Sequence, residues 1–183
     1  MMRLTFALAG PADAPTLAEL RAEAARDLTG KFGDGHWSTE PTLRGAIADL
    51  RNAQVWVARR GKQPVATFRL ATKKPWAIDT AYFTNCRRAI YLTNMAVQPE
   101  LQRQGVGRRC IEHAIERVRL WPGNAIRLDA YNADAGAGGF YEKCGFRQVG
   151  RVVYRLTPLV YYELLLPRRL RDVANSARHG ERV

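Results

Sequence analysis

The chain has 183 residues, of which 46% are hydrophobic, and a formal net charge of +12. This length suits one domain with one sizeable core, and no apolar run is long enough to cross a membrane. The charge suits a polyanionic ligand, but the sequence has no helix-turn-helix, zinc-finger or aromatic-interleaved basic pattern. We therefore expect no specific nucleic-acid partner and no membrane partner.

The N-terminal part of the chain predicts a strand, two helices and a loop between them. Residues 3–8 form a short apolar run, and Asp13 is placed to cap a helix whose apolar residues recur at three- and four-residue steps. A glycine-rich loop follows over residues 29–37. Ser38 or Thr39 then stands where the cap of a second helix is expected.

The middle of the chain predicts three strands. Residues 54–59 and 65–71 are two of them, separated by a turn over 61–64. The next segment, 72–88, is long for a connection, which usually indicates function or mobility. Residues 89–97 form the third apolar, strand-like run.

The stretch 101–107, with the sequence L-Q-R-Q-G-V-G, lies between that strand and an amphipathic helix. Gly105 and Gly107 let the backbone approach a ligand closely, and the first N–H groups of the helix lie at the positive end of its dipole. Arg103 and Arg108 add positive charge. The pattern predicts a phosphate or pyrophosphate site, and it lacks the third glycine of the dinucleotide fingerprint and the Gly-Lys-Ser/Thr of the P-loop.

The remaining elements complete a mixed pattern. A stop at 121–123 ends the amphipathic helix, residues 125–131 form a strand, and 133–143 form a short helix. Two final strands cover 146–156 and 159–166. The order β-α-α-β-β-β-α-β-α-β-β indicates, by periodicity alone, an α/β or α+β domain.

Two motifs resemble those of the GCN5-related N-acetyltransferases, the GNAT superfamily. Q-x-x-G-x-G at 102–107 is similar to the family's acyl-CoA pyrophosphate loop, and F-Y-E-K-C-G-F at 140–146 to its second motif. The resemblance implies an α+β (mixed α/β) GNAT fold, with a central twisted mixed sheet of about seven strands and helices on both faces. We expect one GNAT domain over residues 1–166 and a basic C-terminal tail over 167–183.

The resemblance implies an acetyl-CoA-dependent N-acetyltransferase that moves an acetyl group to a primary amine of a small molecule or peptide by direct attack. Acetyl-CoA is then a co-substrate, and no metal is expected. In the family, the strand before the loop splays from its neighbour and pairs with pantetheine. The family's asparagine seven residues before the tyrosine is replaced here by Asp134, with Asn132 nearby. The residues implied to bind acetyl-CoA are Met95, Ala96, Val97, Gln102, Arg103, Gln104, Gly105, Val106, Gly107, Arg108, Asn132 and Asp134.

The resemblance also implies an acid and a base. Tyr141 occupies the tyrosine of the second motif, and a phenol is protonated at neutral pH and can donate to a thiolate. Asp129 matches a glutamate that, in ribosomal-protein N-terminal acetyltransferases, is thought to take the amine proton through water. Arg127, on the same face of the strand, is an alternative partner that would give Asp129 a structural role. Other candidate bases are His36, Glu40, Asp79 and bulk water.

Two aromatic segments are candidates for the acceptor site. His36 and Trp37 lie between the first two helices, and Trp76 and Asp79 lie in the long segment 72–88. Aromatic rings beside one carboxylate suit an amine with an apolar or cationic portion. The alternative is that these side chains only anchor their loops.

The cysteine spacing and the terminal segments indicate the cellular compartment and the possible partners. The three cysteines, Cys86, Cys110 and Cys144, are widely spaced and form no C-x-x-C pair, which favours the cytoplasm and no zinc site, with Cys110 in the core. The N-terminus lacks a signal-peptide pattern. A homodimer could form through an edge strand, with residues 160–162 and the basic tail as the candidate contact. A non-catalytic acyl-CoA-binding domain and a nucleic-acid-associated basic protein are the alternative functions.

Overall fold

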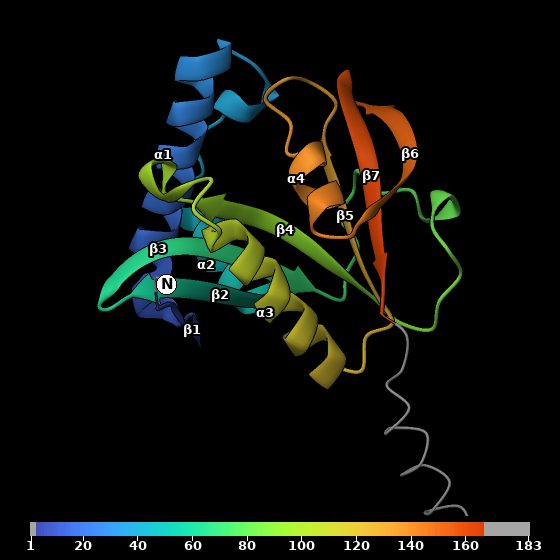
Figure 1. Ribbon diagram of the computed structural model, residues 1–183. Coiled ribbons are helices and arrows are strands. Elements are labelled where there is room, and N and C mark those ends of the chain that lie inside the picture. The colour runs from blue at the N-terminus through green and yellow to red at the C-terminus, as the bar shows by residue number, and fades with distance from the viewer. Residues whose placement is uncertain (1–2, 167–183) are drawn as a thin grey trace, which may run out of the picture.

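The computed structural model describes residues 3–166, so the predicted tail over 167–183 lies outside the described residues. One mixed sheet runs through the domain in the order β1-β2-β3-β4-β5-β7-β6 (Figure 1). The predicted seven-stranded α+β fold and the predicted order of elements are confirmed. The strands are β1 (Thr5–Leu8), β2 (Gln54–Arg60), β3 (Gln63–Ala71), β4 (Ala89–Val97), β5 (Ala125–Tyr131), β6 (Arg147–Tyr154) and β7 (Thr157–Leu165).

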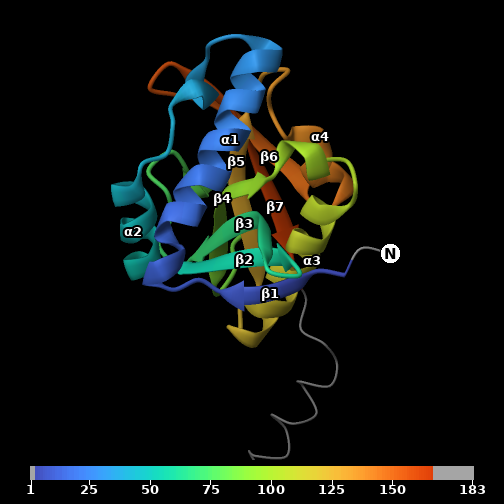
Figure 2. The ribbon, with the colours of Figure 1, turned by 90° about the vertical axis from the view of Figure 1, so that its left-hand side faces the viewer.

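Helices cover both faces of the sheet, as Figure 2 shows. The helices α1 (Ala14–Phe32) and α2 (Leu43–Asn52) lie on one side, called here the α1 face. The helices α3 (Val106–Leu120) and α4 (Gly138–Lys143) lie on the other, the α3 face. Four short 3-10 turns connect them, η1 (Pro11–Asp13), η2 (His36–Ser38), η3 (Thr80–Tyr82) and η4 (Pro99–Leu101).

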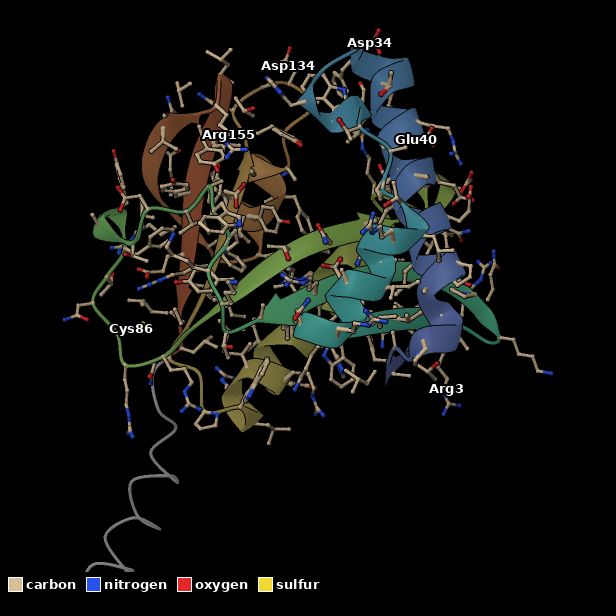
Figure 3. All side chains as sticks on the ribbon, turned by 180° about the vertical axis from the view of Figure 1, so that it is seen from behind. Arg3, Asp34, Glu40, Cys86, Asp134 and Arg155 are labelled. Atoms are coloured by element: carbon tan, nitrogen blue, oxygen red, sulfur yellow. The ribbon has the colours of Figure 1, made fainter. Side chains whose placement is uncertain are left out.

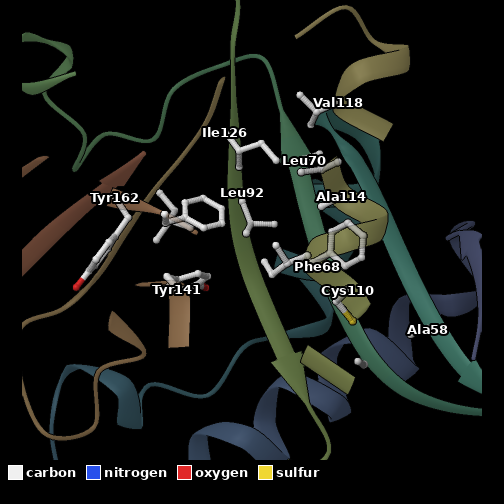
Figure 4. Close-up of a cluster of buried hydrophobic side chains, with 14 of the residues drawn as sticks. Ala58, Phe68, Leu70, Leu92, Cys110, Ala114, Val118, Ile126, Tyr141 and Tyr162 are labelled. Carbon is white, nitrogen blue, oxygen red and sulfur yellow. The ribbon is translucent and has the colours of Figure 1, made fainter. Parts of the chain in front are cut away.

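The largest apolar core fills the α3 face (Figure 4). Alternate residues of the central strands, such as Phe68 and Leu92, pack there against Cys110 and Ala114 of α3. Cys110 is fully buried, as predicted, and burial raises the pKa of its thiol to about 12. This core fixes α3, and with it the loop that precedes α3, against the centre of the sheet.

The strands β4 and β5 are paired over only part of their lengths. They run parallel and are in register at Ala89–Ala125, Ile90–Ile126 and Tyr91–Arg127, and they diverge beyond that last pair (Figure 1). In β4, Asn94 has a left-handed φ of 50° where the register with β3 shifts. The backbone edge of β4 beyond Tyr91 is therefore not paired with β5, and this gap between the two backbones is called here the opening.

Three local predictions were wrong. The helix α1 continues into the first part of the predicted loop and ends at Phe32, and Thr29 Oγ1 donates to the carbonyl of Ala25 inside the helix. The cap of α2 is Thr42, whose side chain accepts from the N–H of Gly45, rather than Ser38 or Thr39. The helix predicted over 133–143 begins only at Gly138, because residues 133–136 form a tight turn.

The prediction that residues 160–162 form an edge-strand dimer contact was also wrong. β7 pairs with β5 on one side and with β6 on the other, so it is an interior strand. Val160, Tyr161 and Tyr162 are buried within it. Residues 160–162 cannot pair with a second copy of the chain, because their backbone groups already bond within the sheet. Within residues 3–166, none of the helices is both long and apolar enough to span a membrane.

Candidate active site

The loop before α3 has the geometry of an anion site. Gly105 caps the helix with a φ of 84°, a left-handed conformation that glycine adopts without strain, and its missing Cβ would meet no atom within 4 Å. The first helical hydrogen bond runs from Arg109 N to Gly105 O, at 3.1 Å. The amides of residues 106–108 precede that bond, at the positive end of the helix dipole.

Glycine suits position 107 for a different structural reason than position 105. A Cβ at Gly107 would lie 3.1 Å from the ring of Phe140 and 3.5 Å from Met95 Cε. The first turn of α3 is thus packed closely against α4 and the end of β4. Sequence reasoning missed Phe140, which joins the two family-like motifs in space.

The side chains of the loop mostly bond to the backbone. Gln102 Nε2 donates to the carbonyl of Val97 at 3.4 Å and Gln104 Nε2 to that of Glu100 at 2.7 Å, which ties the loop to the end of β4 and to η4. Arg108 forms an exposed ion pair with Glu112, with Nε and Oε1 3.3 Å apart. Arg103 is exposed and has a left-handed φ of 58°.

The candidate acyl-CoA strand lies beside this loop. Met95 and Val97 are partly buried against the core of the α3 face, while Ala96 is buried and pairs with Thr67 of β3. The opposite edge of these residues faces the opening between β4 and β5. The predicted splay is therefore present, directly before the loop.

Tyr141 lies on the α3 face near Tyr162 (Figure 4), in a cluster of aromatic rings that also includes Phe140 and Phe146. Its side chain is 9% exposed. Burial raises the pKa of Tyr141 far above its ordinary value, and the negative charge of Asp129 raises it further. The phenol is therefore protonated throughout the neutral range, as a proton donor requires.

Asp129 lies on the α1 face, opposite Tyr141 across the sheet. It is in register with Tyr161 of β7, and it alternates along β5 with Leu128, which points into the core of the α3 face. Burial raises the pKa of Asp129 above its ordinary value. Its charge in turn raises the pKa of Tyr131, Tyr141 and Tyr161, each after the larger effect of burial.

Arg127 does not pair with Asp129. Its Nε lies 3.0 Å from Oε1 of Glu163, and the two side chains are 7% and 1% exposed. The same guanidinium donates to the carbonyl of Thr84 and lies over the ring of Phe83, so it fastens the segment 72–88 to the sheet. Asp129 therefore lacks the ion pair with Arg127 that was the alternative expected from the sequence.

His36 and Trp37 lie at the carboxyl end of β5. Tyr131 Oη donates to the carbonyl of His36 at 3.1 Å, and the rings of Trp37 and Tyr131 meet edge to face at 5.9 Å. His36 Nδ1 lies 3.1 Å from Oγ1 of Thr157. The turn η2 is thus attached two residues beyond Asp129, which sequence reasoning did not foresee.

Trp76 and Asp79 lie elsewhere on the sheet. They line an open cavity of about 600 Å³ with side chains of β6 and β7, including Tyr154 and Tyr161, whereas His36 and Trp37 do not line it. Trp76 is 83% exposed, and Asp79 Oδ1 accepts from the N–H of Ala81 as the cap of η3. The two candidate acceptor segments therefore do not line one cavity.

Asn132 and Asp134 are exposed on the loop between β5 and α4. Figure 3 shows Asp134 at the same end of the molecule as Asp34. Within the described part of the chain, the hydrogen bonds of this loop join Asn132 N to Pro158 and Gly136 N to Ala133, rather than to residues 102–108. Glu40, another candidate base, is exposed and forms an ion pair with Arg26, with Oε1 and Nη1 3.5 Å apart.

The chain is similar to known acetyltransferases. A family model, described as an acetyltransferase (GNAT) domain, matches residues 51–148, just over half of the chain. The uncharacterized N-acetyltransferase YvbK of Bacillus subtilis is 21% identical over 131 residues, which are 72% of this chain and 77% of YvbK. The ribosomal protein bS18-alanine N-acetyltransferase of Escherichia coli is 37% identical over 57 residues, which are 31% of this chain and 38% of that enzyme.

Solved structures show the same fold. A GNAT-family acetyltransferase from Streptococcus agalactiae superposes with a TM-score of 0.74 at 17% identity, over 90% of this chain and 96% of that one. yncA from Salmonella typhimurium, determined with its cofactor acetyl-CoA, superposes with a TM-score of 0.65 at 15% identity, over 91% of this chain and 96% of that one. Because the family model spans the splayed strand, the glycine loop and the Tyr141 motif together, the chain belongs to the GNAT acetyltransferase superfamily and is an N-acetyltransferase.

Proposed function

We propose that the protein transfers the acetyl group of acetyl-CoA to a primary amine of a small molecule or peptide by direct attack on the thioester. The observation that carries the proposal is the opening between β4 and β5. The opening begins after the Tyr91–Arg127 pair and runs along β4 to Met95, beside the start of α3. Tyr141 lies on one face of the sheet there and Asp129 on the other.

The residues present fit acetyl-CoA as co-substrate. The free amides of residues 106–108 and the open space at Gly105 suit the pyrophosphate, since oriented N–H groups at a helix start bind anions. The unpaired edge of residues 95–97 suits the amide groups of pantetheine, which would pair with it as a strand does. The bound thioester supplies the activated acetyl group.

The two faces of the sheet suit different steps of acetyl transfer. An amine that enters from the α1 face attacks the thioester carbon and becomes positively charged, and Asp129 takes its proton through one water molecule. Cleavage of the carbon–sulfur bond releases the thiolate toward the α3 face, where Tyr141 donates a proton to it. Because a phenol with a raised pKa is a weaker acid than a thiol, the phenolate regains its proton rapidly from water.

Thiol release from acetyl-CoA tests the proposal. A panel of amino acids, polyamines, aminoglycosides and peptides is offered as acceptors, and the expected result is thiol release that depends on the amine. The relative named for acetylating an alanine of ribosomal protein bS18 supports including peptides that begin with alanine. Tight acetyl-CoA binding with no turnover of any amine would instead favour a non-catalytic acyl-CoA-binding domain.

Charge reversal at the start of α3 is expected to weaken acetyl-CoA binding. In Arg108→Glu, an anion in the first helical turn opposes the pyrophosphate, so the Kd should rise about tenfold, equivalent to about 1.4 kcal/mol. Calorimetry measures this change. Arg119→Glu, an exposed change near the end of the same helix, is the matched control and should leave the Kd within about threefold. Equal effects of both variants would contradict a pyrophosphate site at residues 103–108.

Replacing Asp129 by asparagine is expected to lower the activity without lowering the stability of the fold. The amide cannot accept a proton, so kcat/KM should fall about 10²-fold, with the largest loss at low pH, where the amine is mostly protonated. An unchanged acidic limb of the pH–rate profile would show that the base lies elsewhere.

Stability should not fall in the same variant. Burial raises the pKa of Asp129 in the folded protein above its unfolded value, so the fold favours the protonated carboxyl. That stabilisation is complete below the unfolded pKa and is lost as the pH rises through the folded pKa. At pH 7 the asparagine variant should therefore have a Tm equal to or above that of the wild type.

A further inference from the structure

A polar cluster occupies the α1 face beside the opening between β4 and β5. Arg21 of α1, Asp49 of α2, Arg69 of β3 and Asn94 of β4 meet there, and Asp49 lies at the centre. Asp49 Oδ2 accepts from Arg21 Nη1 and from Asn94 Nδ2, each at 2.7 Å, and Asp49 Oδ1 lies 3.0 Å from Arg69 Nε. One carboxylate thus faces two guanidinium groups, which leaves the cluster with a net charge of +1.

The cluster also has more donors than acceptors. Arg21 is 7% exposed, and its Nε and Nη2 are buried without a hydrogen-bond partner. Arg69 is 17% exposed, and its Nη1 donates to Thr93 Oγ1 at 3.1 Å, whereas its Nε, although 3.0 Å from Asp49 Oδ1, is buried without a hydrogen-bond partner. Buried donors left unpaired cost stability, so the cluster is suited to an additional anionic acceptor group.

Strand register places this cluster next to the proposed reaction site. Arg69 is opposite Thr93, which lies two residues beyond Tyr91, the last residue of β4 that pairs with β5. Asp129 lies two residues beyond Arg127, the partner of Tyr91, and points to the same face. The Cα atoms of Arg69 and Asp129 are thus separated by at least two strand spacings, roughly 10 Å, and the Arg69 guanidinium lies at the β4 side of this space, beside Thr93 and Asp49. The exposed Asn94 side chain shows that the cluster borders solvent.

We propose that Arg69, supported by Arg21, binds a carboxylate of the acceptor, so that the acceptor is an amine that also carries a carboxylate, an amino acid being the simplest example. This inference rests on the proposed function, because it places the amine near Asp129 and the carboxylate at Arg69. A guanidinium binds a carboxylate with two parallel hydrogen bonds, whereas the net positive charge disfavours polyamines and aminoglycosides. Arg69 is thus a specificity-determining residue.

The test compares acceptors that differ only at the carboxylate. The twenty L-amino acids, β-alanine and 4-aminobutyrate are assayed by thiol release beside the corresponding carboxamides, with wild type, Arg69→Gln, Arg69→Lys and the control Arg119→Gln. Amidation lowers the pKa of the neighbouring amine, so the amides should react faster if basicity alone decided the rate. We expect the best wild-type acceptor to carry a carboxylate and to lose about 10- to 100-fold in kcat/KM on amidation.

Arg69→Gln should lose a similar 10- to 100-fold toward the carboxylate acceptor and change less than threefold toward its amide. Arg69→Lys, which keeps the charge next to Asp49, should fall between Arg69→Gln and wild type, and Arg119→Gln should match wild type. Unchanged acetyl-CoA affinity and Tm verify that each variant is folded. Equal turnover of acids and amides, or equal losses on both in Arg69→Gln, would overturn the inference while leaving acetyl transfer intact.

Binding provides a readout that does not depend on turnover. Calorimetry of the same amino acids against the CoA-saturated protein should show binding that is lost on amidation and in Arg69→Gln. If that binding is seen without any turnover, the carboxylate site stands and the proposed acetyl transfer fails. If neither binding nor turnover depends on the carboxylate, the site is filled by water only and the inference is wrong.

Discussion

Replacing Tyr141 by phenylalanine is expected to lower kcat by about 10²-fold or more, the usual scale for the loss of a general acid. The ring of Tyr141 packs against three other aromatic rings, and phenylalanine keeps those contacts. Acetyl-CoA affinity and Tm should therefore change little. Steady-state kinetics with the best amine of the panel, together with calorimetry of acetyl-CoA binding, measures both effects.

Tyr162→Phe is the matched control for that variant. Tyr162 belongs to the same aromatic cluster, with its ring centroid 6.1 Å from that of Tyr141, and its variant also loses only a hydroxyl. Its kcat should stay within about threefold of wild type. Wild-type turnover by Tyr141→Phe, or an equal loss in both variants, would remove Tyr141 from the mechanism.

Replacing Glu163 by glutamine is expected to cause the largest loss of stability. The Glu163 carboxylate is 1% exposed and Arg127 is 7% exposed, so the variant leaves a buried guanidinium without its counter-charge. Such a change costs about 3–5 kcal/mol, which for a chain of this size lowers Tm by roughly 6–20 °C. Denaturant titration and thermal scans measure the loss.

Two further variants identify the cause of the stability loss in Glu163→Gln. Glu19→Gln breaks an exposed ion pair with Arg26, in which the side chains are 62% and 49% exposed, and should shift Tm by no more than a few degrees. The double variant Arg127→Met, Glu163→Leu removes both charges and should recover most of the stability, because no unpaired charge remains. A glutamine variant as stable as wild type would show that Arg127 finds another partner.

The fold could be predicted to a large extent from the sequence because its signals are local. Alternating apolar residues mark β4 and β5, and the glycine pair with the following amphipathic pattern marks α3. The start of α2 could not be found in this way, because both Thr39 and Thr42 are good caps and only the Thr42 side chain reaches the N–H of Gly45. The interior position of β7 depends on long-range pairing with β5, which no local pattern specifies.

The candidate site was predicted only in part for the same reason. The loop and Tyr141 belong to motifs that are continuous in the sequence. The partner of Arg127 is Glu163, 36 residues away, and the cluster of Arg21, Asp49 and Arg69 joins three separate elements. Charged residues of this kind look like ordinary surface positions in a sequence until the fold buries them together.

The structure of the protein bound to acetyl-CoA tests the central claim most directly. The pyrophosphate oxygens are expected within hydrogen-bond distance of the amides of residues 106–108, and pantetheine along residues 95–97. The thioester should lie in the opening between β4 and β5, with its sulfur toward Tyr141 and its carbonyl carbon accessible from the side of Asp129. A pyrophosphate bound elsewhere, or a thioester outside the opening, would contradict the account.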